Sequence, residues 1–152
     1  MTQIRKAAVV GAGNMGSGIA QKIATEGLPV VLLDMNQAGL DRGMGIIKTL
    51  LNQGVERKLF TPQQVEAILG RITASTDFNL AKDADVVVEA VFEDLKVKRE
   101  VFTKLDAICP PTTILGTNTS SFYVKDLMQG LKHPQRVVGL HYFFHPAKNR
   151  LV

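Results

Sequence analysis

The sequence predicts an α/β fold in which helices cover both faces of a mostly parallel sheet. Two observations carry this prediction. First, short apolar runs typical of strands alternate along the chain with stretches whose apolar residues recur at helical spacing. Second, the strand-like runs are apolar at nearly every position, as expected for strands that a parallel sheet buries on both faces. The 152 residues suffice for one domain with a substantial core.

The first part of the chain predicts two strands and three helices. The strands are expected at residues 6–10 and 29–33, and a helix closed by a glycine joins them over residues 14–26. Apolar residues at helical spacing predict a long helix from residue 37 to about residue 59, although its glycines lower the helix propensity. A short helix is expected over residues 61–69, because a threonine can cap it and a proline suits its first turn.

The same alternation continues through the rest of the chain. A charged amphipathic stretch predicts a helix over residues 95–108, which two following prolines end. The remaining expected elements are strands at residues 72–75, 84–90, 113–116 and 136–140, and a short helix at residues 123–131.

The first strand leads directly into a glycine motif, Gly11-Ala12-Gly13-Asn14-Met15-Gly16, at the start of the first helix. Gly11 permits a tight turn, Gly13 lets a pyrophosphate approach the backbone, and Gly16 lets the helix pack closely on the sheet. The free N–H groups and the positive dipole end of that helix would face the phosphates. This strand–motif–helix order predicts a Rossmann-type fold in which these six residues bind a dinucleotide.

An acidic residue at the end of the second strand indicates which dinucleotide is bound. Asp34 lies 23 residues after Gly11, where a carboxylate accepts hydrogen bonds from the adenine ribose hydroxyls. It would repel a 2′-phosphate, and Met35 and Asn36 offer no cation. We therefore expect NAD rather than NADP. The alternative is an aspartate in a solvated turn.

Further polar residues follow three other expected strands. Glu93, the segment Asn118–Ser121 and His141 each come just after a strand end. The carboxyl ends of parallel strands share one edge of the sheet, where ligands bind, so these residues are expected to converge on one rim. Plainer interpretations exist for each: a first-turn charge for Glu93, helix capping for the serines, and a satisfied, partly buried histidine for His141.

Composition excludes several other classes of function. The net charge of +4 is modest and its cations are scattered among acids, so nucleic acid is not an expected partner. Cys109 is the only cysteine, and no residues have the spacing of a metal site. No apolar run approaches the length of a membrane span, and no signal peptide is evident, so a cytoplasmic protein without a membrane partner is expected.

Four motifs together resemble a known family. They are Gly11–Ala20, Val88–Lys98, Asn118–Ser121 and Gly139–His141. In this order they are similar to the NAD-binding domain of the L-3-hydroxyacyl-CoA dehydrogenases, over nearly the whole chain. The resemblance implies a Rossmann-type domain with a helical-hairpin insertion after the second strand.

The resemblance also implies a reaction, the oxidation of L-3-hydroxyacyl-CoA to 3-oxoacyl-CoA in fatty-acid β-oxidation. A hydride passes from C3 of the substrate to NAD, the hydroxyl proton goes to His141, and Ser120 binds the substrate oxygen near the nicotinamide ribose. The other residues that the resemblance assigns to the cofactor are Met15, Val91, Phe92, Glu93, Lys98 and Asn118. In the hairpin, Thr49, Arg57 and Lys58 are candidates for binding CoA, although a solvated helix face explains them equally well.

Two departures from the family pattern bear on activity. Phe144 stands where the family commonly has an asparagine, for which His145 or Asn149 could substitute. The family glutamate that orients the histidine would follow Val152, and the C-terminal helical domain that covers the acyl-CoA is absent. We therefore expect residues 1–152 to form the NAD-binding domain of a longer protein, homodimeric at full length, and to bind NAD with little turnover alone.

Two alternatives remain open from the sequence. One is an NAD-dependent dehydrogenase of another hydroxyacid. The other is a non-catalytic NAD-sensing module, against which the presence of both Ser120 and His141 argues.

Overall fold

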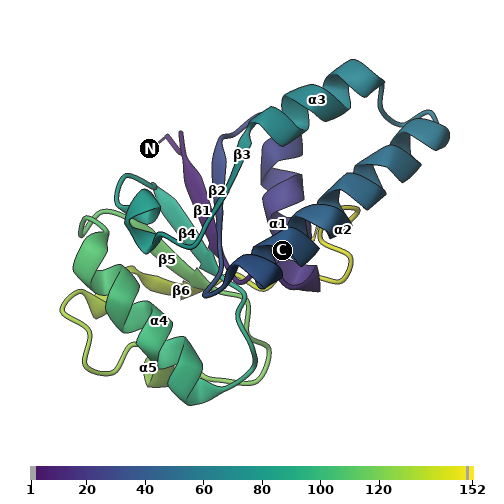
Figure 1. The fold of residues 1–152 in the computed structure, drawn as a ribbon. Helices are drawn as coiled ribbons and strands as arrows, with labels where there is room; N and C mark the ends of the chain where they lie inside the picture. The colour runs from purple at the N-terminus through teal and green to yellow at the C-terminus, as the bar shows by residue number, and fades with distance from the viewer. Residues whose placement is uncertain (1–2, 150) are drawn as a thin grey trace.

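The structure, a computed structural model, describes residues 3–149 and 151–152. Its centre is a six-stranded sheet in the order β3-β2-β1-β4-β5-β6, and every strand pair in it is parallel. Helices cover both faces (Figure 1). The predicted α/β class and the Rossmann-type arrangement are therefore confirmed.

The elements follow one another in the predicted alternation. The strands are β1 (Ala7–Val10), β2 (Val30–Leu33), β3 (Ile72–Ser75), β4 (Val86–Glu89), β5 (Ile114–Thr117) and β6 (Val137–Gly139). The α-helices are α1 (Asn14–Thr25), α2 (Gln37–Glu56), α3 (Pro62–Gly70), α4 (Leu95–Ile108) and α5 (Val124–Leu127). Two short 3₁₀ helices, η1 (Phe78–Ala81) and η2 (Pro134–Arg136), complete the described elements.

Two helices are shorter than the sequence predicts. The helix α2 ends at Glu56, because Lys58 takes a positive φ of 59° and the backbone N–H groups of Leu59 and Phe60 both turn back to the carbonyl of Gly54. The helix α5 ends at Leu127, shortly before Gly130 takes a positive φ of 79°. In both places a left-handed residue redirects the chain.

Two apolar cores lie on opposite faces of the sheet. Alternate side chains of β1 point to opposite sides, so Ala7 and Val9 join one core and Ala8 and Val10 join the other. Helices α1, α2 and α3 close the first core, whereas α4, α5 and η1 close the second. The α2–α3 pair projects beyond the sheet (Figure 1), as the helical-hairpin insertion expected after the second strand.

The helices differ in how their first turns are satisfied. Asn36, Thr61 and Asp94 cap α2, α3 and α4 by accepting a hydrogen bond from a first-turn N–H group. The N-cap of α1 is Gly13, which has no side chain to do so. The first-turn N–H groups of α1 therefore face outward at the end of β1 without a side-chain partner.

Within the described residues, no helix combines the length and the apolar character that crossing a membrane requires.

Candidate functional site

The predicted site residues lie along one edge of the sheet. The strand order brings the carboxyl ends of β2, β1, β4, β5 and β6 next to one another in that sequence. Each of these ends is followed within four residues by one of the predicted groups: Asp34, the glycine motif, Glu93, Asn118 and His141. The polar groups thus form a continuous rim, as the parallel arrangement predicts.

The glycine motif is shaped by close backbone contacts. Gly11 has a φ of +103°, and a Cβ there would lie 2.5 Å from the carbonyl oxygen of Ala90. A Cβ on Gly16 would lie 1.7 Å from the carbonyl oxygen of Gly11. No atom lies within 4 Å of a Cβ built on Gly13. Gly11 and Gly16 therefore let the turn and helix pack, while Gly13 keeps the space above the turn open.

The open space beside Gly13 suits an anion. The uncapped first turn of α1 offers backbone N–H donors there, and the positive end of the helix dipole favours negative charge. A side chain at residue 13 would fill this cradle. These features fit the pyrophosphate of a dinucleotide.

Asp34 is held at the end of β2 by backbone donors. Its Oδ2 accepts a hydrogen bond from the N–H of Ala12 at 2.9 Å, and its Oδ1 accepts one from the N–H of Asn36 at 3.3 Å. Gly39 lies directly behind the carboxylate, because a Cβ there would be 2.7 Å from Asp34 Oδ1. The half-buried carboxylate keeps lone pairs free for the hydroxyls of a ribose.

A cleft of about 900 Å³ connects Asp34 with the glycine motif. Phe78, Val97 and Val101 form an apolar part of its wall, and Arg42 and Lys104 add cations. The ammonium group of Lys104 lies 3.9 Å from the centre of the Phe78 ring. An apolar wall next to the Asp34 carboxylate fits an adenine base. The described residues therefore fit the adenosine diphosphate half of NAD.

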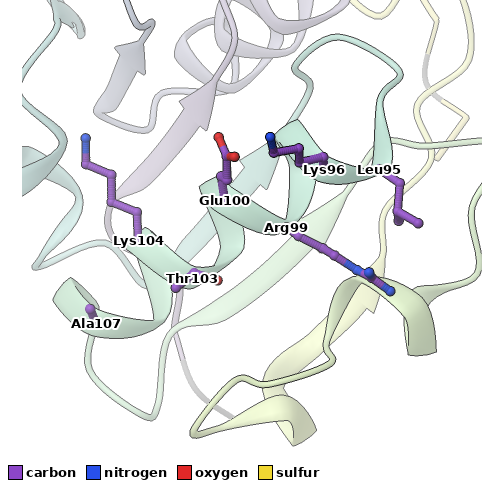
Figure 2. A pocket seen from close by; sticks show the side chains of 7 residues that line it. All are labelled: Leu95, Lys96, Arg99, Glu100, Thr103, Lys104 and Ala107. Carbon is purple, nitrogen blue, oxygen red and sulfur yellow. The ribbon is translucent and has the colours of Figure 1, made fainter.

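A second hollow, of about 670 Å³, lies along the outer face of α4. Figure 2 shows Lys96, Glu100 and Lys104 extending to one side of this helix and Arg99 to the other. Arg99 is engaged with the carbonyl of Asp126 and the side chain of Gln129, and so fastens α4 to the α5 region. This hollow carries none of the predicted site residues.

A buried charged cluster lies beneath the loop after β4. The carboxylate of Glu89 is fully buried and accepts hydrogen bonds from Lys98 Nζ at 2.7 Å, Val91 N at 2.8 Å and Thr117 Oγ1 at 2.7 Å. Lys98 Nζ also lies 3.1 Å from Glu93 Oε2. Sequence reasoning missed Glu89, although an acid that ends an otherwise apolar strand is a signal for such a site.

The same cluster determines the state of Glu93. Partial burial alone would raise the pKa of this carboxyl, but hydrogen bonds from Thr119 and Lys98 outweigh that effect and hold its pKa below the ordinary value. Lys98 itself is only 1% exposed. Its direct contact with a cofactor, implied by the resemblance, stays a prediction.

One hydrogen bond joins the loops after β5 and β6. Asn118 Oδ1 accepts from the backbone N–H of Tyr142 at 2.8 Å, and so fixes the chain next to His141. Ser120 and His141 are both exposed, and no hydrogen bond joins them among the described residues. The His141 ring lies 5.4 Å from the ring of Phe143, centre to centre.

The segment after His141 packs against α1. Pro146 lies so close to Gly18 that a Cβ on this glycine would be 2.6 Å from the proline Cγ. Phe144, at the position of the expected asparagine, is 66% exposed, and its ring lies 3.8 Å from that of His145. Asn149 Oδ1 accepts from Leu151 N. Whether His145 or Asn149 replaces the family asparagine stays a prediction.

The candidate CoA residues lie away from the cleft. Thr49 is on α2, and Arg57 and Lys58 follow its last residue, at the end of the hairpin that projects from the sheet (Figure 1). All three are exposed. Their assignment to CoA stays a prediction.

The other notable groups are structural. Cys109 is buried, its thiol donates to the carbonyl of Ala81, and burial raises its pKa to about 11. No group of metal-ligating side chains occurs in the described part of the chain.

Comparisons with known proteins agree with this geometry. Residues 6–152 match the sequence profile of "3-hydroxyacyl-CoA dehydrogenase, NAD binding domain". The chain is 41% identical over 147 residues to 3-hydroxyadipyl-CoA dehydrogenase of Escherichia coli (strain K12), covering 97% of the chain and 31% of the relative. It is 39% identical over 140 residues to a probable 3-hydroxybutyryl-CoA dehydrogenase of Bacillus subtilis (strain 168), covering 92% of the chain and 49% of the relative.

A solved structure shows the same fold. The crystal structure of 3-hydroxybutyryl-CoA dehydrogenase from Escherichia coli K12 superposes with a TM-score of 0.91 at 39% identity, covering 95% of this chain and 31% of that chain. The chain thus spans between about a third and a half of the length of these relatives.

Proposed function

Since this chain belongs to the 3-hydroxyacyl-CoA dehydrogenase family as an NAD-binding domain, we propose that the whole protein oxidises an L-3-hydroxyacyl-CoA to the 3-oxoacyl-CoA. The family and the cofactor NAD, both predicted from the sequence, are confirmed. The substrate class is supported by the relatives, which are named for 3-hydroxyadipyl-CoA and 3-hydroxybutyryl-CoA. The reaction is one of fatty-acid oxidation.

The cofactor-binding part of the proposal assigns roles along the first two strand ends. The N–H groups at the start of α1 hold the pyrophosphate above Gly13, and the Asp34 carboxylate accepts from the adenine ribose. Val91, Phe92 and Met15 line the groove, together with Glu93, Asn118 and Ser120 on the later loops. When bound, NAD supplies the acceptor for the hydride that leaves C3 of the substrate.

The catalytic part of the proposal concerns His141 and Ser120. The His141 imidazole takes the proton of the substrate hydroxyl, because imidazole can act as a base at neutral pH. The Ser120 hydroxyl holds the substrate oxygen. One observation carries this assignment: the 2.8 Å bond from Tyr142 N to Asn118 Oδ1 ties the histidine loop to the serine loop at the edge that also carries the glycine motif.

The proposed assembly extends beyond this chain. Relatives of which it spans 31% and 49% support a further domain that completes the acyl-CoA site and the homodimer implied by the family resemblance. Thr49, Arg57 and Lys58 would contact the CoA from the α2–α3 hairpin. The single cysteine, unpaired and buried, agrees with a cytoplasmic location, which we also propose.

Replacing His141 by Gln in the full-length protein tests the proposal. The rate of NADH formation from L-3-hydroxybutyryl-CoA should fall by about 10² or more, because a general base contributes that much. The NAD dissociation constant should stay within about twofold, because the variant keeps the cofactor cleft. An unchanged rate would remove His141 from the chemistry, and a non-catalytic NAD sensor would show no rate to lose.

A further inference from the structure

Lys104 lies on a ridge of α4 between the two hollows of the surface. Glu100 and Lys104 line both the cleft of about 900 Å³ and the outer hollow of about 670 Å³. Val97 and Val101, at helical spacing from them, line the cleft alone. The Lys104 side chain, which Figure 2 shows extending from α4 on the same side as Glu100, therefore forms part of the lip of the cleft.

The Lys104 ammonium group is held over an aromatic ring. Its Nζ lies 3.9 Å from the centre of the Phe78 ring, within the range of a cation–π contact. Phe78 is 3% exposed and belongs to the core that α4 closes, so its ring is a fixed support. The ring thus sets where the exposed lysine presents its charge at the cleft.

Sheet pairing brings this lysine and ring next to Asp34. The strands β2 and β3 are parallel neighbours, in which Leu33 pairs with Ser75. Asp34 directly follows Leu33, and Phe78 comes shortly after Ser75. Asp34, Phe78 and Lys104 all line the same cleft. A ribose bound to the Asp34 carboxylate would therefore carry its base toward the wall that Phe78 and Lys104 form.

The chemistry of this wall suits an adenine base in particular. An ammonium group is attracted to the electron-rich face of an aromatic ring. Adenine has such a face, whereas the carbonyl groups of uracil withdraw electron density from its ring. A cation at this wall thus discriminates between bases, while Val97 and Val101 offer apolar contact to any of them.

We propose that Lys104 is a specificity-determining residue that contacts the adenine of the bound dinucleotide. Phe78 is the positioning residue that holds the Lys104 ammonium group for this contact. This inference rests on the proposed function, which places NAD in this cleft. It adds recognition of the base to the recognition of the ribose by Asp34.

Titration calorimetry of the 152-residue chain with NAD tests the role of Lys104. Lys104→Met keeps the length of the side chain and removes its charge. It should raise the dissociation constant by about fivefold, the effect of one lost cation–π contact. Lys104→Arg keeps a cation and should stay within about twofold of the unchanged chain.

The chain offers a matched control for the loss of a cation from a ring. Lys125 Nζ lies 5.1 Å from the centre of the Tyr123 ring, and neither residue lines the cleft. Lys125→Met removes the same charge from the same kind of contact. It should therefore leave the affinity for NAD unchanged.

Titration with ADP and with UDP shows whether Lys104 acts on the base. The two nucleotides share the ribose and the diphosphate, so a cation that only attracts phosphate affects both equally. Lys104→Met should weaken ADP binding by about fivefold and UDP binding by less than about twofold. The preference of the unchanged chain for ADP over UDP should shrink accordingly.

A double-mutant cycle tests the role of Phe78. Phe78→Leu removes the ring and keeps most of the apolar volume of this core residue. Alone it should raise the NAD dissociation constant by about threefold, and in the Lys104→Met background it should add less than about 1.5-fold. Thermal unfolding checks that Phe78→Leu is folded at the titration temperature. The Lys104 variants, at an exposed residue, test the proposal without it.

Three results would overturn the inference. Unchanged NAD affinity in Lys104→Met would leave the lysine no role in binding. Equal losses of ADP and UDP affinity in that variant would show that the charge acts on the phosphates and not on the base. Independent, multiplying effects of Phe78→Leu and Lys104→Met would show that the ring does not act through the lysine. Absence of NAD binding by the unchanged chain would instead defeat the proposed function on which the inference depends.

Discussion

Single residues set the geometry of the cofactor cleft, and two glycines of α2 illustrate this. Gly39 faces the Asp34 carboxylate so closely that any side chain would meet its oxygens at 2.7 to 3.0 Å. Gly45, on the same helix, has no atom within 4 Å of the place where a Cβ would stand. One glycine is therefore required by its neighbour, whereas the other only lowers helix propensity.

Replacing Gly39 by Ala should weaken NAD binding by about tenfold, because the added methyl displaces the Asp34 carboxylate, which we propose accepts from the ribose. Titration calorimetry on the 152-residue chain measures this. The matched control Gly45→Ala should leave NAD affinity unchanged and raise the free energy of unfolding by up to about 1 kcal/mol. Equal NAD affinity in both variants would show that the position of Asp34 does not matter.

Some of these residues could be predicted from the sequence and others could not. The glycine motif and Asp34 are readable because each role depends on residue type and on spacing along the chain. Glu89 and the link from Asn118 to Tyr142 are not, because they depend on which strands become neighbours. The register that sets Glu89 beside Thr117 is a property of the folded sheet.

At the scale of elements, one cluster fastens the end of α4 to the start of β6. Arg136 is 6% exposed and donates to the carboxylate and carbonyl of Asp106 and to the carbonyls of Cys109 and Pro110. Asp106 also accepts from the N–H of Lys132 at 2.6 Å. The cluster thus satisfies carbonyls at the C-terminal end of α4 and anchors the chain that enters β6 and leads to His141.

This cluster should make stability depend on acid pH. Burial raises the pKa of Asp106, but Arg136 and the Lys132 amide outweigh it, so the net pKa is lowered. The Asp106 carboxylate therefore makes its whole contribution to the free energy of unfolding above the unfolded pKa of about 3.9. This contribution is lost as pH falls through the lower folded pKa. Asp106→Asn should lower the free energy of unfolding by about 3 kcal/mol near pH 5.5, because it leaves the buried Arg136 guanidinium without a carboxylate counter-ion.

Urea unfolding between about pH 5.5 and pH 2.5 measures this effect. The difference between the unchanged chain and Asp106→Asn should shrink as the pH falls. The control Asp41→Asn replaces an exposed aspartate on α2. Its free energy of unfolding should equal that of the unchanged chain at every pH in this range. A difference in the free energy of unfolding that stays constant across this range would show that ionised Asp106 does not stabilise the folded chain.

Element boundaries show what periodicity predicts and what it omits. The bounds of the helix Leu95–Ile108 and of the strand Ile72–Ser75 agree with the prediction. For the helix, a charged amphipathic pattern and the two prolines that follow it define these bounds. The ends of α2 and α5 were not, because Lys58 and Gly130 leave the helix through left-handed conformations. A lysine rarely adopts a positive φ, so the residue type at position 58 does not predict this conformation.

At the scale of the whole molecule, the fold collects the loops of five strands at one edge. The part of this edge that runs from Asp34 through the glycine motif to Phe92 lines the cleft of about 900 Å³. The half that carries Ser120 and His141 is exposed, as are Phe143 and Phe144 beside it. The chain therefore combines a formed cleft beside Asp34 and the glycine motif with an exposed surface around the proposed catalytic residues.

This asymmetry predicts how the 152-residue chain behaves alone. It should bind NAD, yet form NADH from L-3-hydroxybutyryl-CoA at less than about a hundredth of the full-length rate, because the proposed general base, His141, is exposed and would not be enclosed with its substrate. The absorbance of NADH gives the rate of turnover for the 152-residue chain and for the full-length protein under the same conditions. A rate near that of the full-length protein would contradict the proposed need for a further domain.

Titration of the unchanged chain with NAD and, separately, with NADP is the sharpest test of the cofactor cleft. We expect one NAD per chain, bound between Asp34 and the glycine motif. NADP should bind about tenfold more weakly or worse, because its 2′-phosphate meets the Asp34 carboxylate. Equal affinity for the two dinucleotides, or tighter binding of NADP, would show that Asp34 does not receive the adenine ribose.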